Sequence, residues 1–346
     1  MKEGPHPAGV RHGRCRASGT IANLAVAAAL LAGCGESPQS VLDPHGPDAE
    51  LVHNITRVLF IGGTVIFLLT MACVGTVVFT RWKLRKVLGS RRSILVMGIV
   101  FPALALAALL VWTLDIARAL VLPRSAEPMR IEMIGWQFWW EVRYPDLGSG
   151  GALVAANEIH IPVGREVELV AISKDVIHSV WIPALRGKID MIPGRTNRIR
   201  FMANRPGVVR GQCAEYCGAQ HALMAFYVVA HPPEEFDRWL EQERRPAPAP
   251  PTDFLALGQR AFGTAGCGAC HAIRGTEWTG GYGPDLTHVG SRLSLAAGAL
   301  DNHRGTLGGW IAGAQDIKPG NRMPSFNSVL TGEELRAVAA WLESLK

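Results

Sequence analysis

One short stretch of the chain carries four side chains with metal-binding atoms. Residues 213–224 supply two thiols, an imidazole and a thioether from Cys213, Cys217, His221 and Met224. Thiolates favour copper, zinc or iron–sulfur clusters, so the ligand types alone leave the metal open. A zinc site, a disulfide between the two cysteines, or core packing of the methionine are the alternative interpretations.

The spacing of the two cysteines favours copper. A mononuclear copper loop needs one cysteine, whereas a second cysteine four positions away allows both sulfurs to bridge two copper ions. Each ion then needs a terminal imidazole: His221 supplies one, and His178, on a β-rich stretch, is well placed to supply the other. Met224 and the backbone carbonyl of Glu215 would be weak axial donors. The sequence therefore predicts a dinuclear copper site that carries electrons.

A second redox motif, Cys267-Gly-Ala-Cys270-His271, lies nearer the C-terminus. Two thiols at this spacing add to the vinyl groups of a haem, and the next histidine binds its iron. A thioredoxin-like cysteine pair is the alternative interpretation, but no βαβ pattern surrounds the motif. The sequence thus predicts a covalently attached haem c.

The sixth ligand of the haem iron is expected from a loop near the end of the chain. Met323 is followed by a proline, and this segment resembles the distal loop of class I cytochromes c. Thioether ligation raises the reduction potential of a haem, as a donor to copper requires. His288 and His303 are the competing candidates; otherwise both are expected to be solvated loop residues.

The elements that position these motifs begin with a membrane anchor. Two runs, 58–80 and 93–114, contain no charged residue, and at about 1.5 Å per residue each spans about 30 Å of hydrocarbon. We expect two transmembrane helices at about 56–80 and 93–115, with buried core helices as the alternative. Residues 81–92 between them carry six cations and no acid, so the positive-inside rule places this loop in the cytoplasm.

The charge of the chain is local rather than general. Its formal net charge is +6, and the six cations of residues 81–92 account for all of it. This distribution argues against a nucleic-acid binder. Together with the helices, it predicts a multi-pass protein of the bacterial cytoplasmic (inner) membrane whose remaining domains lie on the periplasmic side.

The N-terminus predicts export. Residues 1–33 combine a basic start with an apolar run of about a dozen residues, too short to span a bilayer. The run ends in Leu31-Ala32-Gly33-Cys34, which resembles the lipobox of bacterial lipoproteins. We therefore expect a cleaved signal peptide and a lipid on Cys34, with an ordinary cleavage site as the alternative.

Composition then divides the rest of the chain. Residues 34–122 form the N-terminal segment and helix pair, and residues 123–243 contain short β-rich stretches separated by turns, which predict an antiparallel sandwich or barrel. A proline-rich linker at 244–253 precedes a last domain at 254–346. That domain opens with a helical pattern and closes with a helix that begins at a capping box, Thr331 to Glu334.

Residues 40–240 resemble the second subunit of haem–copper cytochrome oxidases. The helix pair, the Gly135-Trp136-Gln137-Phe138-Trp139-Trp140 segment, the His178 strand and the cysteine loop occur in the order of that family. The resemblance implies a two-helix transmembrane hairpin and an all-β cupredoxin-like Greek-key domain whose two copper ions form the centre called CuA. The fused C-terminal segment implies an all-α class I cytochrome c domain, as in caa-type oxidases.

The resemblance also assigns roles outside the copper ligands. The Glu215 carboxylate resembles a ligand for magnesium at the interface with the catalytic subunit; nitrous oxide reductases usually have an aromatic residue there. In many relatives, electrons from soluble cytochrome c arrive at a tryptophan in the position of Phe138. Trp136, Trp139 and Trp140 flank Phe138 here, and each is a candidate for that role or for packing alone.

The implied function is that of subunit II of a respiratory terminal oxidase. Electrons from a cytochrome bc complex or a small cytochrome c would reach haem c, then CuA, then subunit I, where dioxygen is reduced to water and protons are translocated. No residue of this chain offers an oxygen site, so it is an enzyme only within the complex. The alternatives are the small subunit of a copper-containing nitric oxide reductase, or a freestanding redox or copper-delivery lipoprotein.

Overall fold

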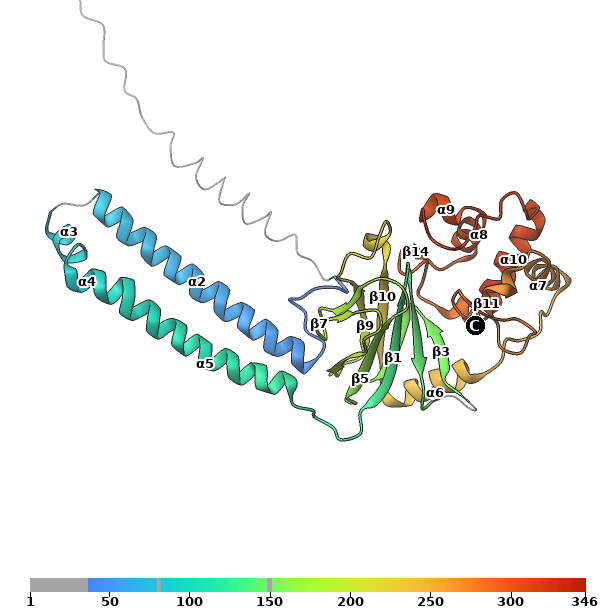
Figure 1. The fold of residues 1–346 in the computed structure, drawn as a ribbon, viewed down its shortest axis with the longest axis horizontal. Coiled ribbons are helices and arrows are strands. Elements are labelled where there is room, and N and C mark those ends of the chain that lie inside the picture. The colour runs from blue at the N-terminus through green and yellow to red at the C-terminus, as the bar shows by residue number, and fades with distance from the viewer. Residues whose placement is uncertain (1–36, 80–81, 148–150) are drawn as a thin grey trace, which may run out of the picture. The chain divides into compact units, whose positions relative to one another are not determined.

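A computed structural model describes residues 37–79, 82–147 and 151–346, without the side chains of residues 82–84. The predicted signal peptide and Cys34 lie outside these residues. Within them, a pair of long helices is followed by a strand-rich domain and then by a mostly helical domain (Figure 1). This order agrees with the expected fold class.

The helix pair comprises α2 (Pro47–Phe79) and a second continuous helix, Arg91–Val121, joined by α3 (Trp82–Leu88). The second helix consists of α4 (Arg91–Leu95), a π-helical turn η1 (Val96–Val100) and α5 (Phe101–Val121). The π turn ends two residues before Pro102, which has no N–H to continue the α-helical bonding. Both helices extend beyond the uncharged runs because polar residues at their ends remain helical.

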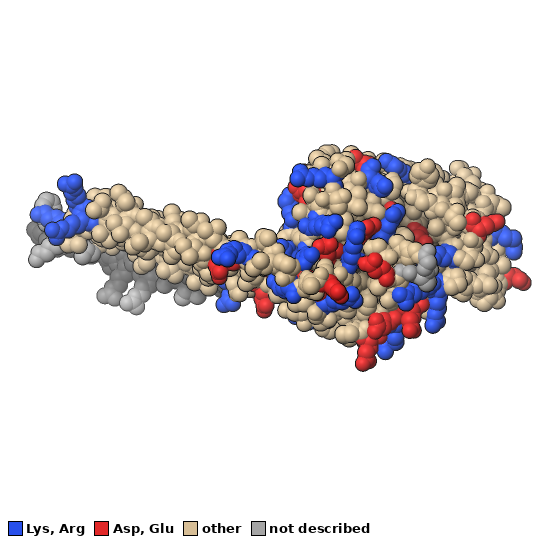
Figure 2. Space-filling view, turned by 60° about the horizontal axis from the view of Figure 1, so that its bottom comes forward, with Lys and Arg blue, Asp and Glu red and all other residues tan. Residues whose placement is uncertain are grey.

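The helices are long and apolar enough to cross a membrane. Their large apolar side chains, such as Phe60, Phe67 and Leu104, are mostly exposed, so the pair needs lipid or a partner protein around it. Figure 2 shows little charge along the middle of the pair and basic residues at its far tip, where α3 and α4 carry Arg85, Lys86, Arg91 and Arg92.

The strand-rich domain is a sandwich of two five-stranded sheets. The first sheet has the order β3-β2-β1-β5-β8 and the second β4-β10-β9-β6-β7. The strands are β1 (Met129–Trp136), β2 (Trp139–Tyr144), β3 (Leu153–Ala156), β4 (Glu158–Pro162), β5 (Val167–Ser173), β6 (His178–Ile182), β7 (Arg186–Met191), β8 (Asn197–Phe201), β9 (Gly207–Cys213) and β10 (Ala225–His231). Their inward side chains, among them Trp140, Tyr144, Phe201 and Phe226, form one core.

The pairing differs from the expected antiparallel arrangement in one respect. β1 pairs with β5, and β10 pairs with β4, in parallel. The strands of each parallel pair are far apart in sequence, so the intervening chain has room to cross over between them. The aromatic-rich segment 129–144 is a hairpin of β1 and β2, with Gln137 and Phe138 at its turn.

Helix α6 (Pro233–Arg244) leads to the C-terminal domain. Its main helices are α7 (Asp253–Thr264), α8 (Arg304–Ala312), α9 (Ala314–Ile317) and α10 (Gly332–Ser344), with short 3₁₀ turns η3 (Cys267–Ala269) and η4 (Val289–Ser291). Two small ladders, β11 (His271–Ala272) with β12 (Thr279–Gly281) and β13 (Ser294–Leu295) with β14 (Leu300–Asp301), complete the domain. The predicted capping box at the start of α10 is confirmed: the Thr331 hydroxyl accepts from Glu334 N–H.

Helices α7 and α10 cross at a glycine. A Cβ added at Gly258 would lie 2.1 Å from the backbone oxygen of Ala337, so only glycine permits this approach. Trp341 of α10 packs edge-on against Phe262 of α7 and against Trp278. This crossing forms the centre of the C-terminal core.

We expect Gly258→Ala to destabilise the C-terminal domain by about 1–3 kcal/mol, because the helices must move apart. Gly309→Ala in α8 is the matched control: nothing lies within 4 Å of its added Cβ, so it should stabilise by about 0.5–1 kcal/mol. Thermal unfolding of the full chain in detergent, followed by circular dichroism, measures both. Equal effects of the two substitutions would contradict the packing described.

Candidate functional site

The two cysteines of the copper motif lie in a loop between neighbouring strands. Cys213 ends β9, the loop contains a 3₁₀ turn η2 (His221–Leu223), and β10 begins at Ala225. The N–H of Cys213 donates to the carbonyl of Met224 at 2.9 Å, which closes the loop at its base. β9 also pairs with β6, whose first residue is His178. The sheet therefore places His178 beside the loop, although it lies far away in sequence.

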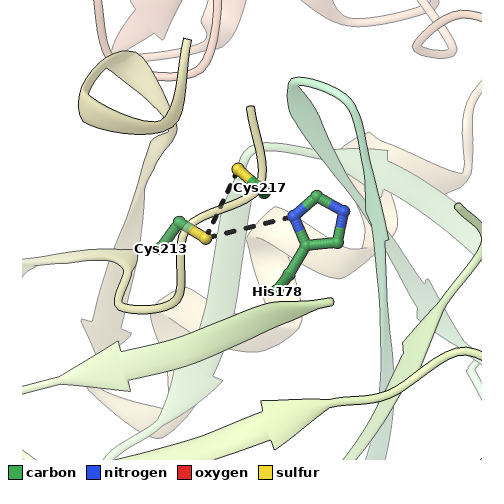
Figure 3. A group of neighbouring side chains, drawn as sticks. All are labelled: His178, Cys213 and Cys217. Atoms are coloured by element: carbon green, nitrogen blue, oxygen red, sulfur yellow. Dashed lines mark hydrogen bonds between the residues drawn. The ribbon is translucent and has the colours of Figure 1, made fainter. Parts of the chain in front are cut away.

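Three of the predicted ligands meet in the domain interior (Figure 3). The Sγ atoms of Cys213 and Cys217 are 3.8 Å apart, and Nδ1 of His178 is 4.0 Å from Sγ of Cys213. One ligand atom from each residue lies within 4.8 Å of the others, and all three side chains are buried. Both cysteines are free, so the geometry does not support the disulfide alternative.

Each of the other predicted donor atoms lies beside one of the two sulfurs. Nδ1 of His221 and Sδ of Met224 each lie 3.7 Å from Sγ of Cys217. On the other side, the backbone oxygen of Glu215 lies 3.2 Å from Sγ of Cys213, the sulfur that faces His178. Each sulfur thus has one imidazole and one weak donor beside it. This donor set fits a dinuclear centre bridged by the two sulfurs better than one tetrahedral ion, and copper better than zinc.

Negative charge concentrates at the buried sulfur pair. The hydrogen bond between the two sulfurs lowers the pKa of Cys213. The same hydrogen bond raises the pKa of Cys217. The pair by itself therefore favours one thiolate and one thiol. Two thiolates this close, out of contact with water, require bound cations.

Asp175 orients His178 so that its Nδ1 faces the sulfur pair. One carboxylate oxygen lies 2.8 Å from Nε2 of His178, which fixes the tautomer that leaves Nδ1 free toward the sulfur. Burial opposes ionisation of both groups, but their hydrogen bond raises the pKa of His178 and lowers that of Asp175. The other carboxylate oxygen accepts from the N–H of Gln137 at 2.7 Å.

The haem motif lines a cavity of about 410 Å³. Cys267, Cys270, His271 and Met323 all contribute to its wall, so the structure brings together the two predicted attachment cysteines and the two predicted iron ligands. Nδ1 of His271 lies 2.8 Å from the carbonyl oxygen of Pro284 and donates to it, which leaves Nε2 as the free ligand atom. Burial lowers the pKa of His271, which keeps the imidazole neutral. The cavity and its donors fit a haem c.

The loop of Met323 is fixed by side-chain hydrogen bonds. Nε2 of Gln315 donates to the carbonyls of Asn321 and Met323, and Oδ1 of Asn321 accepts from the N–H of Met323 at 2.7 Å. The competing histidines do not line the cavity. His303 caps α8, and His288 is buried against the carbonyl of Arg245, which corrects the expectation of a solvated side chain.

The four candidate aromatic residues occupy different places. Trp136 and Trp139 stack with ring centroids 6.0 Å apart, and Phe138 and Trp139 line the haem cavity. Trp140 is fully buried and packs edge-on against His178 and Phe226, so its place is in the core beside the copper loop.

Two residues at the site had no role predicted from the sequence. Gln137 lines the haem cavity, and its Nε2 donates to the carbonyl of Cys217 at 2.6 Å. Lys318 lines the same cavity and reaches the copper loop.

The Glu215 carboxylate points outward: it is 43 % exposed and lies 3.8 Å from Nζ of Lys188. It is therefore available to a partner or an ion at the surface.

Two family models match the chain. Residues 129–231 match the periplasmic domain of cytochrome c oxidase subunit II, and residues 255–346 match cytochrome c. The cytochrome c oxidase subunit 2 of Alkalihalophilus pseudofirmus is 32 % identical over 338 residues, which cover 92 % of this chain and 94 % of the relative. The chain belongs to the cytochrome c oxidase subunit 2 family.

Further matches carry the same name. The cytochrome c oxidase subunit 2 of Bacillus subtilis is 26 % identical over 351 residues, covering 93 % of this chain and 96 % of the relative. Among solved structures, the periplasmic domain of subunit II of cytochrome oxidase from Bradyrhizobium japonicum matches with 31 % identity and a TM-score of 0.33, covering 36 % of this chain and 97 % of that one.

Membership carries several consequences. The chain is a subunit 2 with a fused C-terminal cytochrome c domain, the arrangement of caa-type oxidases, and it is part of an oxidoreductase complex with other oxidase subunits. The subunit II domain implies copper, and the cytochrome c domain implies haem c.

The role of Asp175 can be tested by Asp175→Asn. The amide accepts only through one oxygen and has no charge, so His178 loses part of its orientation, and copper affinity should fall roughly 10–100-fold. Competition with a chelator measures the affinity, and Asp237→Asn, at an exposed position on α6, is the control. Equal copper affinity in the Asp175 variant and the wild type would contradict the role described.

Proposed function

We propose that this subunit accepts electrons at a haem c and passes them through a dinuclear CuA centre to the haem–copper subunit of a terminal oxidase, which reduces dioxygen to water and translocates protons. One observation carries the proposal: the buried sulfur pair has two separate sets of terminal donors, and Gln137 joins this loop to the wall of the haem cavity.

At the copper site, Cys213 and Cys217 would bridge the metals, with His178 and His221 as terminal ligands and Met224 and the Glu215 carbonyl as weak donors. Two coppers that share charge through bridging sulfurs accept and release one electron with little change in geometry. The chain contributes rigidity: Cys213 and His178 are fixed by sheet pairing, and Met224 is 1 % exposed. Exclusion of water further limits reorganisation around the centre.

At the haem site, Cys267 and Cys270 would form the covalent links, with His271 and Met323 as axial ligands. A haem c held this way accepts and donates single electrons. The chain keeps His271 neutral and oriented through Pro284, and it holds Met323 through Gln315 and Asn321. Methionine ligation gives the higher potential that a donor to copper needs.

The partners follow from these roles. A cytochrome bc complex or a small cytochrome c would reduce the haem. Glu215, half-exposed beside the copper loop, would bind magnesium where subunit I docks, and the two long helices would anchor the chain in the bacterial inner membrane with both redox domains on the periplasmic side.

Purification from membranes in mild detergent tests this function. The chain should copurify with a large haem-bearing subunit, and the complex should consume oxygen when haem c is reduced. A complex that reduces nitric oxide instead, or a chain recovered without partner subunits, would contradict the proposal.

The two centres can be separated by substitution. Met323→Leu should remove the sulfur-ligand absorption of the ferric haem and lower its potential, with the copper spectrum unchanged. Met224→Leu should change the copper spectrum and leave the haem spectrum as it is, so each variant serves as the control for the other. A haem sulfur-ligand band that survives in Met323→Leu would refute the axial assignment.

A further inference from the structure

Lys318 lies where the haem cavity and the copper loop meet. It directly follows α9, lines the haem cavity, and has only 2 % of its surface exposed. Among the described side chains, no other lysine or arginine is buried. Burial of an ammonium group is costly unless each of its N–H bonds has an acceptor, so its position calls for an explanation.

Three backbone carbonyls surround the ammonium group. Nζ donates to Phe138 at 2.9 Å, to Leu223 at 2.7 Å and to Ala296 at 2.8 Å. Three acceptors match the three N–H bonds of a charged lysine. Phe138 belongs to the turn that faces the haem cavity, Leu223 to the copper loop, and Ala296 to the cytochrome domain itself. One side chain thus joins three segments.

Nearby groups offset part of the electrostatic cost of burying Lys318. Burial lowers the pKa of Lys318 to about 7, and a Coulombic interaction with Cys217 opposes that effect. The three carbonyl dipoles act in the same direction as Cys217, because each points its negative end at the ammonium group. These groups, which come from both domains, offset only part of the loss of hydration.

Neighbouring contacts surround Lys318 on both sides. The Gln220 amide in the copper loop donates to the carbonyl of Pro319 at 2.7 Å, and the N–H of Ala225 donates to the carbonyl of Ala297 at 2.9 Å. Ala296 and Ala297 both have positive φ, 52° and 59°, which is uncommon for residues other than glycine. In this backbone the Ala296 carbonyl faces Lys318 and the next carbonyl, that of Ala297, faces the copper domain.

We propose that Lys318 is a positioning residue that holds the cytochrome domain against the copper loop and thereby sets the rate at which electrons pass between the two centres. The proposal rests on the proposed electron relay. In the transfer, the haem loses one electron and the copper pair gains it, and no bond is made or broken. The same contact covers Phe138, which is 6 % exposed, so an external donor must deliver electrons to the haem rather than to this turn.

The test compares Lys318→Met with Lys346→Met in the purified oxidase complex. Methionine keeps the length of the side chain but donates no hydrogen bond, and the control removes the same charge from an exposed position in the same domain. Hydrogen exchange of the Ala225 amide, which bonds across the interface, reports contact between the domains without reference to activity. Rapid photoreduction of the haem then gives the rate of electron transfer to copper.

In Lys318→Met we expect faster exchange at Ala225 and transfer at least about tenfold slower, because small misplacements of reacting partners cost up to about a hundredfold. The spectra of both centres should keep their ligand bands, which shows that the ligands are in place, and every readout should stay unchanged in Lys346→Met. Wild-type exchange at Ala225 or a wild-type transfer rate in Lys318→Met would overturn the proposal.

A second variant, Lys318→Gln, should change both readouts in the same direction, because its shorter amide cannot reach all three acceptors. If neither Lys318 variant incorporates haem and copper while the control does, Lys318 is needed for folding and the positioning role is wrong. If the proposed electron relay itself is wrong, the wild-type complex will show no electron transfer from haem to copper. Hydrogen exchange of the Ala225 amide would still decide whether Lys318 holds the two domains together.

Discussion

Two cysteine sulfurs 3.8 Å apart in the interior of a β-sandwich place like charges where water cannot screen them. In the absence of cations, the pair avoids this by keeping one proton, as the opposite pKa shifts of Cys213 and Cys217 indicate. Full ionisation of both sulfurs requires positive charge between or beside them. The surrounding donors, an imidazole and a weak donor at each sulfur, fit the coordination of two ions better than that of one.

Strand pairing in the sandwich holds the two sulfurs and their neighbouring donors in place. Cys213 ends β9, Met224 directly precedes β10, and β6 brings His178 beside them, so three of the predicted ligands depend on the register of three strands. Around them, Asp175 fixes one imidazole and Gln137 holds the carbonyl of Cys217. Because Gln137 and Phe138 also line the haem cavity, the same hairpin turn connects the copper loop to the cytochrome domain.

The sequence could predict those features whose residues are close together in the chain. The cysteine loop, the haem motif, the capping box at Thr331 and the two apolar helices are all local patterns. Contacts between distant segments could not be predicted: Lys318 and the Phe138 carbonyl are 180 positions apart, and Gln137 and Cys217 are 80 apart. The parallel pairing of β1 with β5 and the burial of His288 also depend on tertiary packing, which no periodicity encodes.

Paramagnetic resonance of the copper-loaded, oxidised protein tests the central claim most directly. A pair bridged by Cys213 and Cys217 should bind two coppers per chain and show one unpaired spin divided equally between them. The Cys217→Ser variant should lose that signal. A wild-type spectrum from a single copper ion, or binding of zinc in preference to copper, would contradict the account.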